Sequence, residues 1–187
     1  MKTYQPKRKG SKVVTGMARL SYANVHEPRS IEGQEPKYSA SLIIPKSDTA
    51  TITAVQEAIE EAKELGKAKW GGKIPTGLKI PLRDGDEDRP DDAAYADSYF
   101  VNANSARKPE IVDLHGARDL GPNDVYSGCY ARVSINFFAY SAAGNRGIGC
   151  GLGNIQKLDD GEPLGGFSRA EDDFDFEDSA DDMSFLQ

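Results

Sequence analysis

Residues 126–140 alternate between apolar side chains and side chains that suit contact with a nucleic acid. The odd positions from Cys129 to Ala139 are all apolar, which predicts a strand with one face on a core. The even positions carry aromatic, guanidinium or small polar groups, namely Tyr130, Arg132, Ser134, Asn136, Phe138 and Tyr140. A solvated strand face ordinarily carries Lys, Glu and Thr instead. Aromatic rings beside an arginine suit flat bases joined by phosphates, so this face predicts contact with a single nucleic-acid strand.

Every second residue of 147–153 is a glycine, and the residues between them are apolar. If Ile148, Cys150 and Leu152 join the apolar face of 126–140, the bare glycine face lies beside the aromatic and arginine side chains. Such a face lets a ligand backbone approach closely, or it permits the sharp coiling of a small barrel, and the two uses are compatible. The turn at 141–145 decides the register, which the sequence leaves open.

Other aromatic and basic side chains extend this interpretation to the rest of the chain. We expect bases to stack on the rings and phosphates to meet the cations. The predicted contacts are Arg19, Tyr22, Lys37, Tyr99, Arg107, Lys108, Tyr130, Arg132, Phe138, Tyr140 and Arg146. A one-residue slip in a short strand moves a side chain to the core, so a core position is the alternative for Tyr22 and Tyr99.

The elements that carry these residues are mostly strands. Strand patterns occur at Val13–Val25, Tyr38–Pro45, Ser98–Asn104 and Glu110–Leu114, and in the strand–turn–strand unit of 126–154. A single long helix is predicted over Thr49–Leu65, where apolar residues recur at helical spacing after a capping Ser47 or Asp48. Together they predict a mainly β fold, a five-stranded OB-like antiparallel barrel with one inserted α-helix and a disordered acidic C-terminal tail.

Trp70, the only tryptophan, lies among basic residues of the irregular stretch 67–83. Basic residues around an aromatic ring fit a loop that binds a nucleic-acid strand. The alternative, which we favour, is that Trp70 anchors this stretch at one end of the barrel.

The net charge of −7 averages over two unlike regions. Residues 1–158 hold 22 Lys and Arg against 19 Asp and Glu, whereas residues 159–187 hold one basic residue against eleven acidic ones. The composition predicts a flexible basic arm over 1–12, an OB-fold nucleic-acid-binding domain over 13–166 and a disordered acidic tail over 167–187.

Aromatic residues are spaced among the carboxylates of the tail, at Phe174, Phe176 and Phe185. A tail that only keeps the protein soluble does not need them. A tail that docks on partner proteins does, with rings as anchors and charge as steering. We also expect the tail to fold back on the basic surface and compete with DNA.

No pattern of a metal, cofactor or catalytic site is present. The two histidines and two cysteines lie far apart, without zinc-ligand spacing, and 147–153 is neither a phosphate-binding loop nor a dinucleotide-binding turn. We therefore expect no metal, no cofactor and no catalytic residue. Cys129 and Cys150 are expected to be buried free thiols rather than a disulfide. No apolar run approaches the length of a membrane span and the N-terminus lacks a signal-peptide pattern, so we expect a cytoplasmic protein without a membrane partner.

The segments Tyr126–Tyr140, Gly144–Gly149, Gly151–Gln156 and Asp160–Gly165 together resemble a family of bacteriophage single-stranded-DNA-binding proteins, formerly a phage family of unknown function. The similarity covers most of residues 10–166. The resemblance implies an oligonucleotide-binding fold, sequence-independent binding of single-stranded DNA, and service in phage DNA replication or recombination inside the bacterial host. It also implies that phage or host replication proteins are partners of the acidic tail.

Two other classes of function remain as alternatives. A protein-interaction or DNA-mimic module would act through the acidic tail, with the barrel as its scaffold. A double-strand binder or strand-annealing protein is disfavoured, because the predicted helix is acidic on its outer face and offers no recognition helix. The sequence is compatible with a homo-oligomer.

Overall fold

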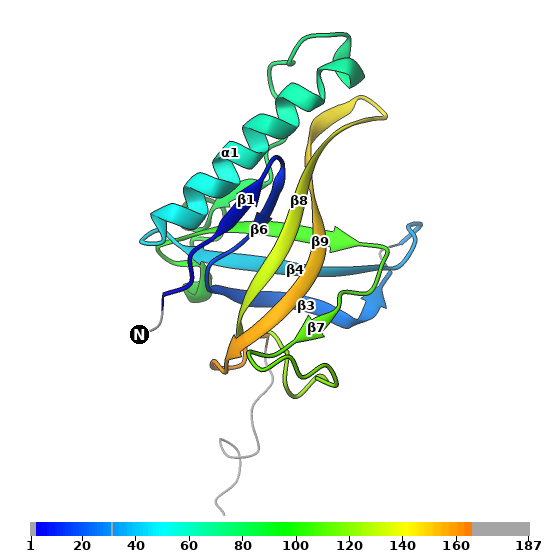
Figure 1. Ribbon diagram of the computed structural model, residues 1–187. Coiled ribbons are helices and arrows are strands. Elements are labelled where there is room, and N and C mark those ends of the chain that lie inside the picture. Colours follow the sequence, from blue (N-terminus) through cyan, green and yellow to red (C-terminus); the bar gives the residue numbers. More distant parts are fainter. Residues whose placement is uncertain (1–2, 31, 166–187) are drawn as a thin grey trace, which may run out of the picture.

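The computed structural model describes residues 3–30 and 32–165 as a mainly β structure (Figure 1). The principal strands are β3 (Ala18–Arg29), β4 (Lys37–Pro45), β6 (Ser98–Ser105), β8 (Tyr130–Ala142) and β9 (Asn145–Asp159). Their pairings close into a ring in the order β3, β4, β6, β9, β8 and back to β3. The predicted set of principal strands is confirmed. The β6–β9 pairing that closes the ring is parallel, whereas the sequence predicted antiparallel pairing throughout.

Short strands extend the ring at its edges, namely β1 (Lys7–Lys9), β2 (Lys12–Val14), β5 (Leu82–Asp84) and β7 (Ile111–Val112). The pairing of β2 with β8 differs from the flexible arm predicted over 1–12. Val13 is fully buried opposite Ile135, so the apolar face of β8 continues into β2 and holds the basic segment against the ring. The first predicted strand is accordingly divided between β2 and β3.

Helix α1 spans Thr49–Leu65, the range that the apolar spacing predicted. Asp48 caps it, because its Oδ1 accepts a hydrogen bond from the Thr51 N–H at 3.1 Å. The buried face of α1 includes Ile52, Val55 and Ile59, and the helix lies over one end of the ring beside the β8–β9 hairpin (Figure 1). Shorter helical segments are η1 (Lys67–Trp70), α2 (Gly85–Asp88) and η2 (Ala93–Tyr95).

Trp70 is an anchor, as expected. Its ring is buried and its Nε1–H donates to the Tyr140 carbonyl at 3.2 Å. This contact ties the stretch after α1 to the hairpin. Within the described residues, no helix has the length and apolarity needed to cross a membrane.

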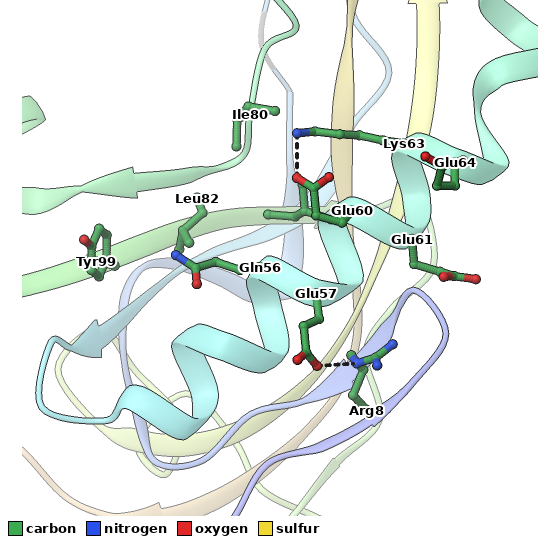
Figure 2. A pocket seen from close by; sticks show the side chains of 11 residues that line it. Arg8, Gln56, Glu57, Glu60, Glu61, Lys63, Glu64, Ile80, Leu82 and Tyr99 are labelled. Atoms are coloured by element: carbon green, nitrogen blue, oxygen red, sulfur yellow. Dashed lines mark hydrogen bonds and ion pairs between the residues drawn. The ribbon is translucent and has the colours of Figure 1, made fainter. Parts of the chain in front are cut away.

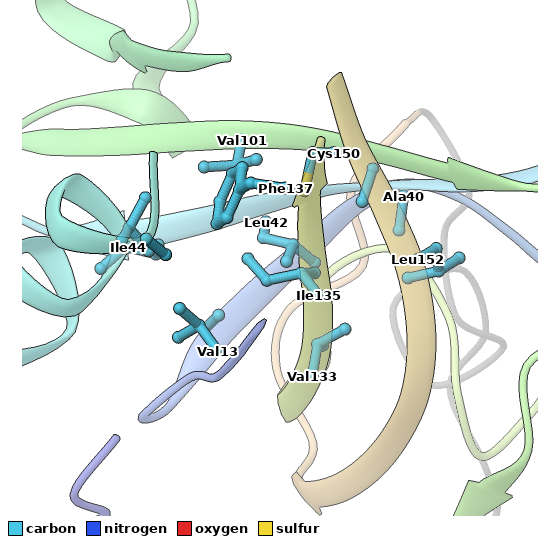
Figure 3. Packing of buried hydrophobic residues seen from close by; sticks show 14 of the residues in the cluster. Val13, Ala40, Leu42, Ile44, Val101, Val133, Ile135, Phe137, Cys150 and Leu152 are labelled. Atoms are coloured by element: carbon cyan, nitrogen blue, oxygen red, sulfur yellow. The ribbon is translucent and has the colours of Figure 1, made fainter. Parts of the chain in front are cut away.

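The interior of the ring is filled by apolar side chains from every principal strand (Figure 3). Leu42, Val101 and Phe137 meet there from β4, β6 and β8, and Ile44 and Val13 close the end nearest α1. Cys129 and Cys150 are buried free thiols, as predicted. Burial raises the pKa of both thiols above the ordinary value.

The β8–β9 hairpin turns at Ala143 and Gly144, which both have positive φ. This turn pairs Phe137 with Cys150 and Ala139 with Ile148 on the inner face of the ring. Phe138 pairs with Gly149 and Tyr140 with Gly147 on the outer face. The register that the sequence left open is thus the one in which the glycine face lies beside the aromatic face.

Candidate nucleic-acid interface

A row of small polar residues crosses the outer face of the ring from strand to strand. Successive register pairs join Asn24 to Ser39, Ser39 to Asn104, Asn104 to Gly151, Gly151 to Asn136 and Asn136 to Lys12. Directly paired residues share one face of a sheet, so these six residues form a continuous track, here called the polar belt. The belt offers amide and hydroxyl groups together with one site, Gly151, that has no side chain.

One end of the belt lies in a groove of about 410 Å³, here called the basic groove. Its lining includes Lys12, Arg107, Lys108, Asn136, Gly151 and Gly153. The three cations are exposed, and none of them forms an ion pair with another residue of the described chain. Their charges are therefore available to phosphate groups.

The other end of the belt lies in a groove of about 520 Å³, here called the Tyr22 groove. Its lining includes Tyr22, Asn24, Arg29, Lys37, Ser39 and Asn104. Arg29 and Lys37 are also exposed and unpaired within residues 3–30 and 32–165. Asn104 lines this groove and Ser105 lines the basic groove, so the two grooves adjoin along β6.

Aromatic side chains of β8 cover two of the four glycines of β9, Gly147 and Gly149. A Cβ added to Gly149 would lie 2.6 Å from Cζ of Phe138, and one added to Gly147 would lie 2.8 Å from the Tyr140 hydroxyl. The glycines at these positions accommodate the protein's own rings. At Gly151 an added Cβ would meet no atom closer than 3.5 Å, so close approach of a ligand is possible there, beside Phe138, which is 44% exposed.

Two arginines predicted to meet phosphates, Arg19 and Arg132, donate hydrogen bonds to backbone carbonyls. Arg19 donates from Nη2 to the Glu162 carbonyl at 2.7 Å and lies over the ring of Tyr130. Arg132 donates from Nε to the Thr15 carbonyl at 2.9 Å and from Nη2 to the Gln5 carbonyl at 2.8 Å. Neither arginine lines the two grooves, and their part in binding stays a prediction.

Tyr99 lies away from the polar belt, in a groove of about 710 Å³ beside α1 (Figure 2). It is half-buried against the core, and Lys46 lies over its ring at 5.4 Å from the centroid. Glutamates of α1 line the opposite side of this groove, where Glu57 pairs with Arg8 and Glu60 with Lys63. This acidic surface would repel phosphates, so the core alternative describes Tyr99 better.

Arg146 is exposed at the tip of the β8–β9 hairpin, outside both grooves. The predicted tail anchors Phe174, Phe176 and Phe185 lie outside the described residues. Within the described chain, no group of His, Cys, Asp and Glu side chains is arranged to hold a metal ion.

The sequence interpretation included Asn136 in the predicted nucleic-acid face but missed Asn24, Ser39 and Asn104 of the belt, as well as Arg29. The sequence holds a signal for the β6 part of the polar belt, because Asn102 and Asn104 alternate with the buried Val101 and Ala103. That alternation indicates a polar outer face. Its continuation across β4 and β9 depends on strand register, which is not visible in any one segment.

Comparison with known proteins identifies the family. The profile of the family described as Enterobacter phage Enc34, ssDNA-binding protein, matches residues 11–184. Putative protein p50 of Acyrthosiphon pisum secondary endosymbiont phage 1 is 30% identical over 169 residues, covering 83% of this chain and 87% of that protein.

Solved structures agree with this assignment. The single-stranded DNA-binding protein from bacteriophage Enc34, solved in complex with ssDNA, is 25% identical with a TM-score of 0.75, over 87% of this chain and 98% of that one. The bacteriophage T7 single-stranded DNA binding protein gp2.5 is 16% identical with a TM-score of 0.59, over 93% and 97% of the two chains, and shows likeness of fold alone.

These matches confirm both the OB-like fold and the family resemblance found in the sequence. The bacteriophage Enc34 protein of this family binds single-stranded DNA. The chain belongs to the family of the Enterobacter phage Enc34 single-stranded-DNA-binding protein.

Proposed function

We propose that this protein binds single-stranded DNA without sequence preference, along the polar belt and the two grooves at its ends. The observation that carries the proposal is the set of five cations, without an ion-pair partner among residues 3–30 and 32–165, around a continuous row of small polar groups. The family match and the ssDNA complex of the Enc34 protein support it. In OB folds, the face of the second and third strands is the usual site for oligonucleotides, and β4 and β6 are those strands here.

Within this site, each type of side chain has a separate role. Lys12, Arg107 and Lys108 neutralise phosphates at one end of the belt, while Arg29 and Lys37 do so at the other. Bases stack on Phe138 and Tyr22, which are 44% and 54% exposed, and each stacked ring contributes about 1–3 kcal/mol. The amides of the belt contact the strand without demanding a particular base.

The protein serves phage DNA replication or recombination in this proposal, and its acidic tail recruits replication proteins. The tail also competes with DNA for the cationic grooves. Two observations support the competition: the charge contrast between 1–158 and 159–187, and the position of Gly165, which lines a small cavity together with Tyr22. Gly165, the last described residue, thus lies beside the Tyr22 groove.

Fluorescence anisotropy of labelled oligo-dT and of its duplex, each at two salt concentrations, tests the proposal. We expect the single strand to bind more tightly than the duplex. The logarithm of its affinity should fall linearly with the logarithm of salt concentration, with a slope of about −0.7 per phosphate contact.

Equal affinity for both forms would contradict the single-strand preference and favour a double-strand or annealing role. No binding to either form at low salt would remove the proposal. The alternative would then be a protein-interaction or DNA-mimic module that acts through the acidic tail.

A further inference from the structure

Tyr22 has a backbone conformation that an aromatic residue rarely adopts. Its φ is 46°, at a point where the β3–β4 register shifts between Ser21 and Asn24. This bulge turns the Tyr22 side chain away from the interior of the ring of strands, and 54% of the residue is exposed. Left-handed φ at a bulky residue costs free energy and persists only where the surroundings hold it, as at sites of function.

Arg89, which follows α2, holds the Tyr22 side chain. Its guanidinium carbon lies 5.0 Å from the centroid of the Tyr22 ring, and its Nη1 donates to the Tyr22 hydroxyl at 3.2 Å. The same guanidinium lies 4.9 Å from the Tyr95 ring and 5.7 Å from the Phe100 ring. Arg89 forms no ion pair within the described residues, so its charge is directed to the three rings.

The side chains of Tyr95 and Phe100, which lie behind Arg89, form a rigid support. Tyr95 and Phe100 are fully buried and meet edge to face at 4.9 Å between centroids. The Tyr95 hydroxyl donates to Oγ of Ser41 on β4 at 2.9 Å, which fixes this support to the ring of strands. Arg89 therefore connects a fixed part of the fold to an exposed ring in the Tyr22 groove.

We infer that Arg89 is a positioning residue for DNA binding, which holds Tyr22 as a preformed platform for one base. The inference rests on the proposed function. A free tyrosine side chain would have to give up its rotamer freedom when a base stacks on it, and a ring already held by Arg89 avoids that cost. The exposed part of the Tyr22 ring, which Arg89 does not cover, lines the groove that also contains Arg29 and Lys37.

The test compares Arg89→Ala with Arg83→Ala in binding to oligo-dT and to an abasic oligonucleotide of the same length. Arg83 is a matched control, since it lies over Phe100 at 5.2 Å and pairs with Asp88 but is not among the residues that contact Tyr22. We expect Arg89→Ala to weaken oligo-dT binding roughly tenfold, as Tyr22→Ala does, with little further loss in the double variant. Arg83→Ala should bind oligo-dT like the wild type, and all of these variants should bind the abasic strand alike.

The alternative role for Arg89 is a direct phosphate contact. In that case Arg89→Ala would weaken abasic binding as well, and the salt slope for oligo-dT would become shallower by about 0.7. Arg89→Lys separates the roles even if Arg89→Ala is unstable. Lysine keeps the charge but loses the planar group that lies over the rings, so oligo-dT binding should fall while abasic binding and salt slope stay at wild-type values.

Either a shallower slope or equal effects of Arg89→Ala and Arg83→Ala would overturn the inference while leaving the proposed function standing. Wild-type protein that does not bind oligo-dT would overturn the proposed function, and this inference with it.

Discussion

At the scale of single residues, identical side chains have different uses depending on what surrounds them. Arg19 and Arg132 donate to backbone carbonyls and fasten the two ends of the described chain, whereas Arg29 and Arg107 line the grooves without a partner among the described residues. The glycines of β9 likewise differ, because Gly149 lies under Phe138 while Gly151 remains open.

Substitution of Gly149 tests how the Phe138 platform is held. A methyl group there would lie 2.6 Å from Cζ of Phe138, so Gly149→Ala must displace the ring. We expect the free energy of unfolding to fall by about 1 kcal/mol and oligo-dT affinity to fall with it. Thermal unfolding and anisotropy measure the two effects.

The control introduces Gly149→Ala into a protein that already carries Phe138→Ala. Without the ring, Gly149→Ala should cause little further loss of stability, because the nearest clash is gone. An equal drop in melting temperature in both backgrounds would mean that the added methyl group disturbs the strand rather than the ring.

At the scale of elements, the basic groove exists because β6 and β9 diverge. The two strands pair at Asn104 and Gly151, and β7 takes over the pairing with β9 at Ile155. The chain between β6 and β7 crosses this gap and is held by the bond from the Ile155 N–H to the Glu110 carbonyl at 2.9 Å. Arg107 and Lys108 belong to that crossing, which explains why they line the groove over Gly151 and Gly153.

Neutralising this crossing segment should change the salt dependence of binding. The double variant Arg107→Gln, Lys108→Gln removes two phosphate contacts, so the slope of log affinity against log salt should become shallower by about 1.4. Anisotropy titrations with oligo-dT over a series of salt concentrations measure the slope.

A matched control, the double variant Lys63→Gln, Lys67→Gln, removes one cation of α1 and one of η1. These lysines pair with Glu60 and Glu64 at 2.7 Å each, away from the belt. The control should keep the wild-type slope. An equal change in both double variants would mean that net charge, rather than the groove, controls affinity.

At the scale of the whole molecule, charge is divided between a mildly basic body and a strongly acidic C-terminal segment. The Leu164 N–H donates to the Ser127 carbonyl at 2.9 Å, and Leu164 and Gly165 line the cavity that Tyr22 shares. The last described residues thus lie at one end of the DNA path proposed here, along the polar belt and its two grooves.

Deletion of residues 168–187 should therefore tighten oligo-dT binding at low salt, and the gain should shrink as salt screens the charges. A full-length variant with the tail carboxylates replaced by amides is the control, because it keeps the length of the tail and removes its charge. Both variants should bind alike. Unchanged affinity in both would exclude competition by the tail.

Local patterns in the sequence were sufficient for much of the fold. The apolar spacing of 49–65 determined the bounds of α1 and its buried face, because helical periodicity is a property of one segment. Strict alternation likewise determined which side of β8 faces the core. It thereby placed Phe138 on the outer face as a candidate platform for a base. The family resemblance rested on the same hairpin.

The tertiary structure decided what covers each outward face, because alternation defines two faces of a strand but not its neighbours. The strand pattern of 98–104 leaves Tyr99 either as a DNA contact or as a core residue, and β6 carries it to the groove beside α1. The polar belt arises only when Asn24, Ser39, Asn104 and Gly151 are brought into one register across strands distant in sequence. Tyr22 depends on a bulge and on Arg89, 67 residues away, a contact that only the packing of α2 and its following loop against the ring creates.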